Sequence, residues 1–310
     1  MTPQVRTEDS TGLVAGFGAY LIWGMFPIFF GLLDPAGSLE VLAHRMVWTV
    51  LLMLAVLLVL GKLGSLRGLS ARTWGLVTAA TVAIAVNWGV YIYAVVSGNV
   101  VEAALGYFVN PLVSVLIGVL VFREKIRAAQ IAALVLAAIA VVIITVDYGR
   151  PPVVALTLAL SFALYGVVKK VVPLDPRTSL TAEGLVAAPF AIVYLVVLLV
   201  SGTGSFLGNG VGHSLLLVAA GPVTAAPLLL FGLAAQRIPL TTLGLLQYLT
   251  PALQMVWGVV VMHEVMPPSR WVGFALIWVA LVVFTTDALA RARRTRRAGS
   301  RLPETVGDRA

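Results

Sequence analysis

Ten apolar stretches, each long enough to cross a membrane as a helix, constrain the fold of this chain more than any other feature. A bilayer core about 30 Å thick needs about 20 mainly apolar helical residues. Short segments rich in Gly and Pro separate the stretches. The predicted spans cover residues 12–33, 39–60, 73–95, 102–122, 127–146, 151–168, 180–200, 213–234, 240–262 and 269–290. The sequence therefore predicts an all-α integral membrane protein with ten transmembrane helices.

Composition supports an apolar environment. Sixty per cent of the residues are hydrophobic and 11% are charged, with a mean hydropathy of +1.01, whereas soluble domains are about one quarter charged. The first apolar run is long enough to span a bilayer and has no small-residue cleavage site, so we expect it to stay on the protein.

The basic residues indicate which way the spans face, because Lys and Arg are biased toward cytoplasmic loops. In the ten-span arrangement Arg150 and Arg270 fall on one side, Arg45 lies inside a span, and every other Lys and Arg falls on the opposite side. Both termini are therefore expected in the cytoplasm, with the chain in the plasma (inner) membrane. Residues 291–310 are predicted to form a basic, disordered tail attracted to anionic lipid, not to nucleic acid.

The chain contains an internal repeat with an offset of 140 residues. Segment 110–124 aligns with segment 250–264, and a Pro, a Gly, two Val and a Glu are identical in register. Because five helices is an odd number, the second unit would enter the bilayer upside down, as in transporters built from inverted repeats. The predicted organisation is an N-terminal tail, two five-helix repeats and a C-terminal tail, over residues 1–11, 12–149, 150–290 and 291–310.

These motifs resemble a known family. A Pro near the start of a span, an apolar run to Gly and a terminal Glu, in the fourth and ninth of ten helices, resemble the EamA family of the drug/metabolite transporter superfamily. Segments 19–27, 43–45, 87–88, 102–111 and 244–251 together resemble its RarD branch. The resemblance covers residues 12–290 and implies transport of a small metabolite, in the export direction, through a central cavity between the repeats.

Polar side chains inside the spans are the candidate substrate contacts, because polar groups are costly in hydrocarbon. Tyr107, Asn110 and Ser114 share one face of the fourth helix, at spacings i, i+3 and i+7. The ninth helix repeats these positions as Gln247, Thr250 and Gln254. The two stripes either line a cavity or hold the bundle together through interhelical hydrogen bonds, which are worth about 0.6 kcal/mol each.

The third helix adds an amide beside aromatic rings. Asn87 and Tyr91 lie one turn apart next to Trp88, an arrangement that suits a neutral or zwitterionic organic solute. Trp23 and Tyr165 match across the repeats and are expected either to line the cavity or to pack at the helix crossing. The predicted bend points for alternating access are Gly106, Pro111, Gly244 and Pro251.

The second helix carries the candidate charged group. Glu40 and His44 lie one turn apart and could share a proton or an ion pair. Arg45 lies about 9 Å into the span, where a central Arg costs about 2.5–3.5 kcal/mol on insertion scales. Two interpretations stay open: Arg45 contacts a substrate carboxylate or phosphate while His44 carries a proton, or Arg45 snorkels outward beside a structural pair.

Motifs for catalysis are missing. There is no Cys, the sequence has no P-loop, and Pro267 stands where a zinc-protease helix beginning at His263 would need its second His. We therefore expect no metal, no cofactor and no enzyme activity, with membrane lipid and a small-molecule solute as partners and no nucleic acid. Glu102 and Glu183 are expected at the membrane interface. The alternatives are a membrane scaffold or receptor without flux, or an intramembrane hydrolase, and both a monomer and a homodimer stay open.

Overall fold

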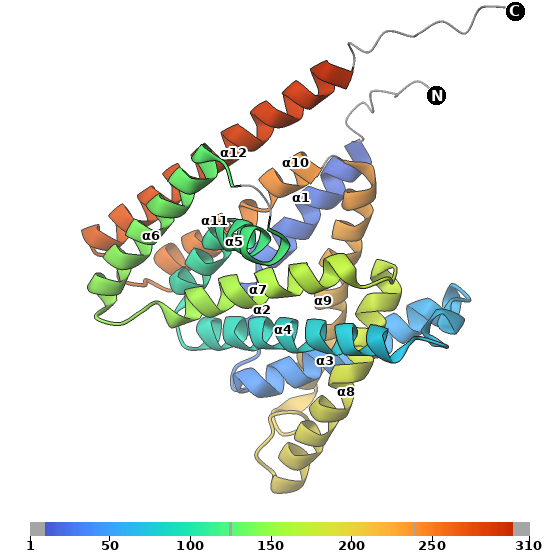
Figure 1. Ribbon diagram of the computed structural model, residues 1–310. Helices are drawn as coiled ribbons and strands as arrows, with labels where there is room; N and C mark the ends of the chain where they lie inside the picture. The colour runs from blue at the N-terminus through green and yellow to red at the C-terminus, as the bar shows by residue number, and fades with distance from the viewer. Residues whose placement is uncertain (1–9, 124–125, 239, 300–310) are drawn as a thin grey trace, which may run out of the picture.

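The computed structural model describes residues 10–123, 126–238 and 240–299, and the regular structure in these residues is helical throughout (Figure 1). The helices are α1 (Ser10–Gly24), α2 (Phe26–Gly31), α3 (Ser38–Val59), η1 (Leu63–Leu66), α4 (Ala71–Val96), α5 (Val100–Phe122), α6 (Ala128–Tyr148), α7 (Val153–Val171), α8 (Pro176–Ser201), α9 (Gly210–Arg237), α10 (Leu240–Leu246), α11 (Leu249–Val256), η2 (Trp257–Val261) and α12 (Pro268–Gly299).

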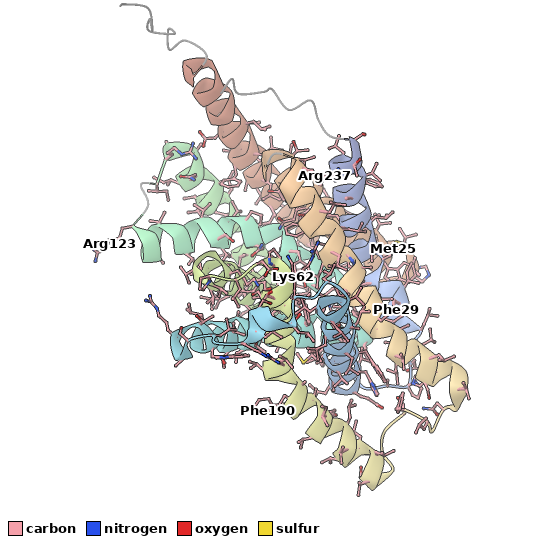
Figure 2. The ribbon with its side chains drawn as sticks, turned by 90° about the vertical axis from the view of Figure 1, so that its right-hand side faces the viewer. Met25, Phe29, Lys62, Arg123, Phe190 and Arg237 are labelled. Atoms are coloured by element: carbon pink, nitrogen blue, oxygen red, sulfur yellow. The ribbon has the colours of Figure 1, made fainter. Side chains whose placement is uncertain are left out.

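Eight helical segments among the described residues are long and apolar enough to cross a membrane, and two shorter apolar helices cover Val153–Lys169 and Leu249–Val261. Large apolar side chains also cover much of the outside of the molecule. Phe190 on α8 is 78% exposed and Val59 at the end of α3 is 85% exposed (Figure 2). A surface of this kind is unfavourable in water and favourable in hydrocarbon. The chain is a multi-pass membrane protein.

The helices of the first half pack mainly against helices of the second half. The principal pairs are α3 with α8 and α9, α4 with α7 and α8, α5 with α7 and α11, α1 with α9 and α11, and α6 with α12. Helices α6 and α12 lie side by side at one edge of the molecule (Figure 1). A core that contains Phe108, Leu112, Phe274 and Ile277 joins them to α5. The halves therefore form one bundle and not two separate ones.

Glycines set how closely some of these helices approach one another. A Cβ added at Gly221 of α9 would lie 2.6 Å from the backbone carbonyl carbon of Trp48 on α3. A Cβ at Gly184 of α8 would lie 2.8 Å from the Cβ of Val50. Small residues at such contacts let helix backbones approach, which is how helices associate where lipid removes the hydrophobic driving force.

Two of the predicted spans contain helix breaks that the sequence analysis did not predict. The span predicted over residues 12–33 divides into α1 and α2 at Met25, and Pro27 lies in the first turn of α2. The span predicted over residues 240–262 divides into α10, α11 and η2, and Pro251 lies in the first turn of α11. Pro lacks an N–H and its ring clashes with the carbonyl four residues earlier, and these breaks lie two to four residues before Pro27 and Pro251.

The last helix is longer than predicted. Helix α12 runs from Pro268 to Gly299, so residues 291–299 of the predicted disordered tail are helical. This stretch is mostly Arg with two Ala, both strong helix formers, and it continues an apolar helix that is already nucleated. The remaining tail residues 300–310, and residues 1–9, lie outside the described residues.

Buried carboxylates tie loops of one half to helices of the other. Glu264, between η2 and α12, accepts hydrogen bonds from the backbone N–H of Val100 at 2.6 Å and of Val101 at 3.1 Å, at the start of α5. Burial raises the pKa of the Glu264 carboxyl, and the bonds from Val101 and Val100 act in the opposite direction. The carboxylate thus satisfies two N–H groups that the helix itself leaves free.

Candidate functional site

Asn87 on α4 lies at the centre of a hydrogen-bonded group that joins three helices. Its Nδ2 donates to the backbone oxygen of Leu158 at 3.0 Å and to Oγ of Ser161 at 3.1 Å, both on α7. Its Oδ1 accepts from the hydroxyl of Tyr107 on α5 at 3.2 Å. Asn87 is 1% exposed, and this set of partners uses both its amide group and its carbonyl. In this conformation Asn87 therefore joins α4, α5 and α7, as expected for an interhelical hydrogen bond.

A second group surrounds Gln254 on α11. Its Nε2 donates to the hydroxyl of Tyr91 on α4 at 2.9 Å and, at 3.4 Å, to the backbone oxygen of Trp23 on α1. Trp23 is the residue four positions before Pro27, which cannot donate to this carbonyl. The amide of one half thus partners the helix break of the other half.

Ring contacts join these two groups. The ring centroids of Tyr91 and Tyr107 lie 5.6 Å apart at 66°, within the range of favourable aromatic pairs. The structure therefore brings together Asn87, Tyr91, Tyr107 and Gln254, four of the predicted contacts. We call these four residues the central polar group.

Arg45 on α3 is buried in an aromatic cage. Its Cζ lies 3.9 Å from the ring centroid of Trp88, 5.2 Å from that of Phe26 and 5.8 Å from that of Phe30. Its Nε donates to Oγ1 of Thr224 on α9 at 2.8 Å. The residue is 2% exposed, so its guanidinium does not snorkel to the surface in this conformation.

Glu40 and His44 bond to different partners. Glu40 accepts hydrogen bonds from the backbone N–H of Ser205 at 2.7 Å and of Phe206 at 3.2 Å. The Nδ1 of His44 accepts from the indole N–H of Trp48 at 3.2 Å, and its ring centroid lies 4.8 Å from that of Phe206. Glu40 therefore anchors the loop before α9, and a proton transfer between Glu40 and His44 stays a prediction.

Several buried polar atoms in this region have no hydrogen-bond partner among the described residues. A buried polar group without a partner costs about 1–3 kcal/mol, and the large majority of such groups in folded proteins are paired. Unpartnered atoms at the middle of a bundle therefore indicate places where another molecule or another conformation supplies the partner. They are Nε2 of His44, Nη1 of Arg45, Oδ1 of Asn110, Oε1 of Gln254 and Nε1 of Trp257.

The side chains of the other predicted contacts have partners outside the central polar group. The ring of Trp23 packs against Tyr20 and Phe231, with ring centroids 5.4 and 5.9 Å away. Tyr165 on α7 donates its hydroxyl to Oε2 of Glu183 at 3.1 Å. Gln247 lies half-buried at the break between α10 and α11.

The remaining members of the two stripes also differ in their surroundings. Asn110 is 4% exposed, one turn beyond Tyr107 on α5. Thr250 donates its hydroxyl to the backbone oxygen of Tyr20 at 2.8 Å, whereas Ser114 is exposed. The two stripes are therefore not equivalent in their partners, although their spacing is the same.

The predicted bend points occupy three different environments. Pro251 lies in the first turn of α11, just after a helix break, whereas Pro111 lies within the continuous helix α5. A Cβ at Gly106 would lie 2.7 Å from the backbone oxygen of Ala155, so Gly106 permits the close contact between α5 and α7. Gly244 lies within α10. Whether any of them bends during function stays a prediction.

A buried ion pair on α7 and α8 was not predicted. Glu183, expected at the interface, has a side chain that is 4% exposed and accepts from Nζ of Lys169 at 2.6 Å. It also accepts from Oγ of Ser179 at 2.8 Å. The available signal was the short connection between α7 and α8, which places a Lys in the last turns of one helix beside an acid in the next. Glu102, also expected at the interface, is 1% exposed.

A pocket lies between α3, α4 and α8. Its lining includes Thr49, Thr81, Ile84, Trp88, Glu183 and Ala187. Trp88 therefore belongs both to the pocket and to the aromatic cage of Arg45, and the pocket contains residues of both halves. In this conformation the pocket is small, with a volume of about 20 Å³, which is room for about one water molecule.

Comparison with known proteins agrees with the geometry. Protein RarD of Streptomyces exfoliatus is 50% identical over 295 residues, which cover 94% of each chain. A transporter of Vibrio cholerae, described as uncharacterized, is 39% identical over 301 residues and covers 96% of this chain and 99% of its own. A solved crystal structure with 20% identity has a TM-score of 0.58 and covers 89% of this chain and 98% of its own, so it shares the fold.

The family comparison finds the same unit twice. Residues 10–146 and residues 151–286 each match the EamA-like transporter family. The expected resemblance to the EamA family and its RarD branch is confirmed by these matches and by the names of the relatives. The chain belongs to the EamA-like transporter family of membrane proteins.

Proposed function

We propose that this protein is a secondary transporter that moves a small amphipathic organic solute across the plasma membrane, in the export direction. The solute binds at the junction of the two halves, beside the central polar group and Arg45. Alternating access arises from movement of α4 and α5 against α9, α10 and α11, with both termini in the cytoplasm.

The observation that carries this proposal is the set of unpartnered polar atoms at the middle of the bundle. A bundle that served only as a scaffold would gain stability by filling these positions with apolar side chains, because polar networks with open positions are costly. Transport gives the open positions a use, since a solute can satisfy them during each cycle. Membership in a transporter family supports the same conclusion.

The helix pairs support an inverted repeat. In the predicted repeat the counterparts are α1 and α7, α3 and α8, α4 and α9, α5 and α11, and α6 and α12. When each helix is replaced by its counterpart, the packed pair α4–α7 becomes α9–α1, α5–α7 becomes α11–α1, and α3–α9 becomes α8–α4, and all of these pairs are present. The pairs α3–α8, α5–α11 and α6–α12 each convert into themselves. This is the pattern expected when a pseudo-twofold axis relates the halves, and with five spans in each half such an axis lies in the membrane plane.

The positions of the chain ends and of the basic residues support the orientation. The first residue of α1 and the last residue of α12 lie toward the same end of the molecule in both views (Figures 1 and 2). Arg123 directly follows α5 and points away from the bundle (Figure 2), on the side that also holds most of the other Lys and Arg residues in the ten-span arrangement. A cytoplasmic location of this side follows from the bias of basic residues.

An efflux measurement tests the proposed function. Proteoliposomes that contain the full chain are loaded with a mixture of amino acids, aromatic carboxylates and amphipathic drugs, with and without a pH gradient. We expect the protein to release a subset of these solutes faster than empty liposomes do. Gln254→Leu removes the Oε1 acceptor and the bond to Tyr91, so we expect about a fivefold to tenfold slower release.

Gln130→Leu is the matched control. Gln130 is also an amide, but it lies in the first turn of α6, where its Oε1 accepts from the backbone N–H of Arg127 at 3.0 Å. We expect release by this variant to stay within about twofold of the original protein, because a half-buried helix cap outside the central polar group contributes mainly to helix stability. Release of no solute above the empty liposomes, or equal effects of the two substitutions, would contradict the proposed function.

A further inference from the structure

The guanidinium of Arg45 carries a charge that no acid in the described part of the chain compensates. Arg stays protonated in proteins, and a buried charge is normally paired. The polar partner that the structure gives Arg45 is the neutral hydroxyl of Thr224, and Nη1 has no partner. The aromatic cage supplies attraction but no negative charge.

The buried and half-buried carboxylates of the described residues are already engaged elsewhere. Each bonds either to a basic side chain or to backbone N–H groups. The pairs are Glu102 with Arg150, Asp147 with Arg270, Glu183 with Lys169, and Asp287 with Arg127, while Glu40 and Glu264 bond to backbone N–H groups. Each of these carboxylates would have to leave its present partner to become a counterion of Arg45.

Arg270 shows what a structurally paired arginine looks like in the same protein. Its Cζ lies 4.1 Å from the ring centroid of Tyr148, and its Nε donates to Oδ2 of Asp147 at 2.8 Å. Arg45 has the same stacking, at 3.9 Å from Trp88, but no carboxylate. The two sites therefore differ by one anionic group, which is the component that Arg45 lacks.

We propose that the transported solute carries an anionic group of the carboxylate class that binds Nη1 of Arg45, while its apolar body packs beside Trp88. This inference rests on the proposed transport function and adds the chemical class of the solute. The planar guanidinium matches both carboxylate and phosphate, and the single charge of a carboxylate is the one that a lone buried Arg compensates, whereas a phosphate monoester carries about −1.5 to −2. The pocket beside Trp88 is lined by apolar side chains such as Ile84 and Ala187 together with Thr49, Thr81 and Glu183. An aromatic or aliphatic body would occupy it in a more open conformation of the transport cycle.

The unpartnered atoms on α5 and α11 indicate which further groups the solute carries. Oδ1 of Asn110 and Oε1 of Gln254 are acceptors without donors. Gln254 is connected to Arg45 through Tyr91 and Phe30, because Tyr91 accepts from Gln254 and its ring lies 5.9 Å from that of Phe30 in the cage. A solute that carries N–H donors as well as a carboxylate would bind these two acceptors and Arg45 together.

Binding of matched acids and amides tests the inference. The full chain in lipid nanodiscs is titrated with phenylacetate against phenylacetamide, and with indole-3-acetate against indole-3-acetamide, and the thermal unfolding midpoint is followed. Ligands that bind the folded state raise this midpoint. We expect the acids to raise it and the amides to fail at equal concentration. Arg45→Gln should weaken acid binding about 10- to 150-fold, the loss expected for a charge-assisted hydrogen bond.

Arg45→Lys tests whether acid binding depends on a positive charge at this position. This variant keeps a cation, so it should retain a preference for the acid over its amide with reduced affinity, even if Arg45→Gln fails to fold. The inference is overturned if the amides bind as well as the acids, if Arg45→Gln keeps the preference, or if no acid shifts the midpoint. Chloride or inorganic phosphate acting alone through Arg45 would identify a resident inorganic anion and would also overturn it.

The same preparations distinguish this inference from the proposed function. Reconstituted into liposomes, a protein that releases phenylacetamide and neutral drugs as fast as phenylacetate is a transporter without the carboxylate site. A protein that releases none of the probes fails as a transporter. Faster release of the acids by the original protein, lost in Arg45→Gln, supports both.

Discussion

Replacing Gly221 by Ala is expected to destabilise the protein strongly, although it adds only one methyl group. The new Cβ would lie 2.6 Å from the carbonyl carbon of Trp48 and 2.8 Å from its oxygen. Backbone atoms of α3 cannot move aside as a flexible side chain can, so α3 and α9 must separate. Overpacking of this kind costs about 1–3 kcal/mol of unfolding free energy, and Gly221→Leu should prevent stable folding.

The effect should extend to the candidate site. The contact between α3 and α9 also positions Thr224, the hydrogen-bond partner of Arg45. Gly232→Ala is the matched control, because Gly232 lies in the same helix and a Cβ there would meet nothing within 4 Å. Ala is the better helix former, so this control should keep or slightly raise the unfolding midpoint. Equal midpoints for the two Ala variants would show that α3 and α9 do not approach as described.

Arg270→Gln and Arg45→Gln should differ widely in their effect on stability. Both remove a guanidinium that stacks on an aromatic ring. Arg270→Gln also leaves Asp147 without its cation, and loss of one partner of such a partly buried pair is expected to cost about 1–3 kcal/mol of unfolding free energy. Arg45→Gln removes a buried charge that has no acidic partner, so we expect a change within about 1 kcal/mol in either direction.

The comparison is made by thermal and denaturant unfolding of both variants in nanodiscs without added ligand. A substitution that harms function while it leaves stability unchanged is typical of functional sites. A loss of stability in Arg45→Gln as large as that in Arg270→Gln would mean that Arg45 is held for the fold, and the carboxylate site would lose its main argument.

Most of the fold could be predicted from the sequence because span length and hydropathy are local properties. The helix breaks at Met25 and at residues 247–248 could not be predicted in this way. Pro111 is accommodated inside α5, whereas Pro27 and Pro251 accompany helix breaks. The difference between these prolines depends in part on tertiary contacts. One is the hydrogen bond from Gln254 to the backbone carbonyl of Trp23, to which Pro27 cannot donate. The sequence does not show which helix will supply such a donor.

The candidate site was predicted in its residues but not in their partners. Helical spacing placed Asn87 with Tyr91 and Tyr107 with Asn110 on shared faces, but the bonds of Asn87 to Tyr107 and Ser161 depend on how three helices meet. Glu40 and His44 have a spacing that favours a pair, yet Glu40 bonds to the backbone of residues 205 and 206. Contacts this distant in sequence leave no local signal.

Arg45 illustrates the remaining gap. The sequence left substrate contact and snorkelling open, since insertion cost depends only on depth. The structure shows the guanidinium buried against Trp88, and the buried and half-buried acids among the described residues are bound elsewhere. The absence of a counterion is a property of the whole fold, and no sequence window could have revealed it.

The central claim is that the two halves cross the membrane in opposite senses around a shared site. The chain has no Cys, so single cysteines can be introduced without background. Gly64, in η1 between α3 and α4, and Thr203, between α8 and α9, occupy corresponding loops of the two halves. In intact cells a membrane-impermeant maleimide should label Thr203→Cys, and should label Gly64→Cys only after permeabilisation. Labelling of both from the same side would contradict the inverted arrangement and the site built on it.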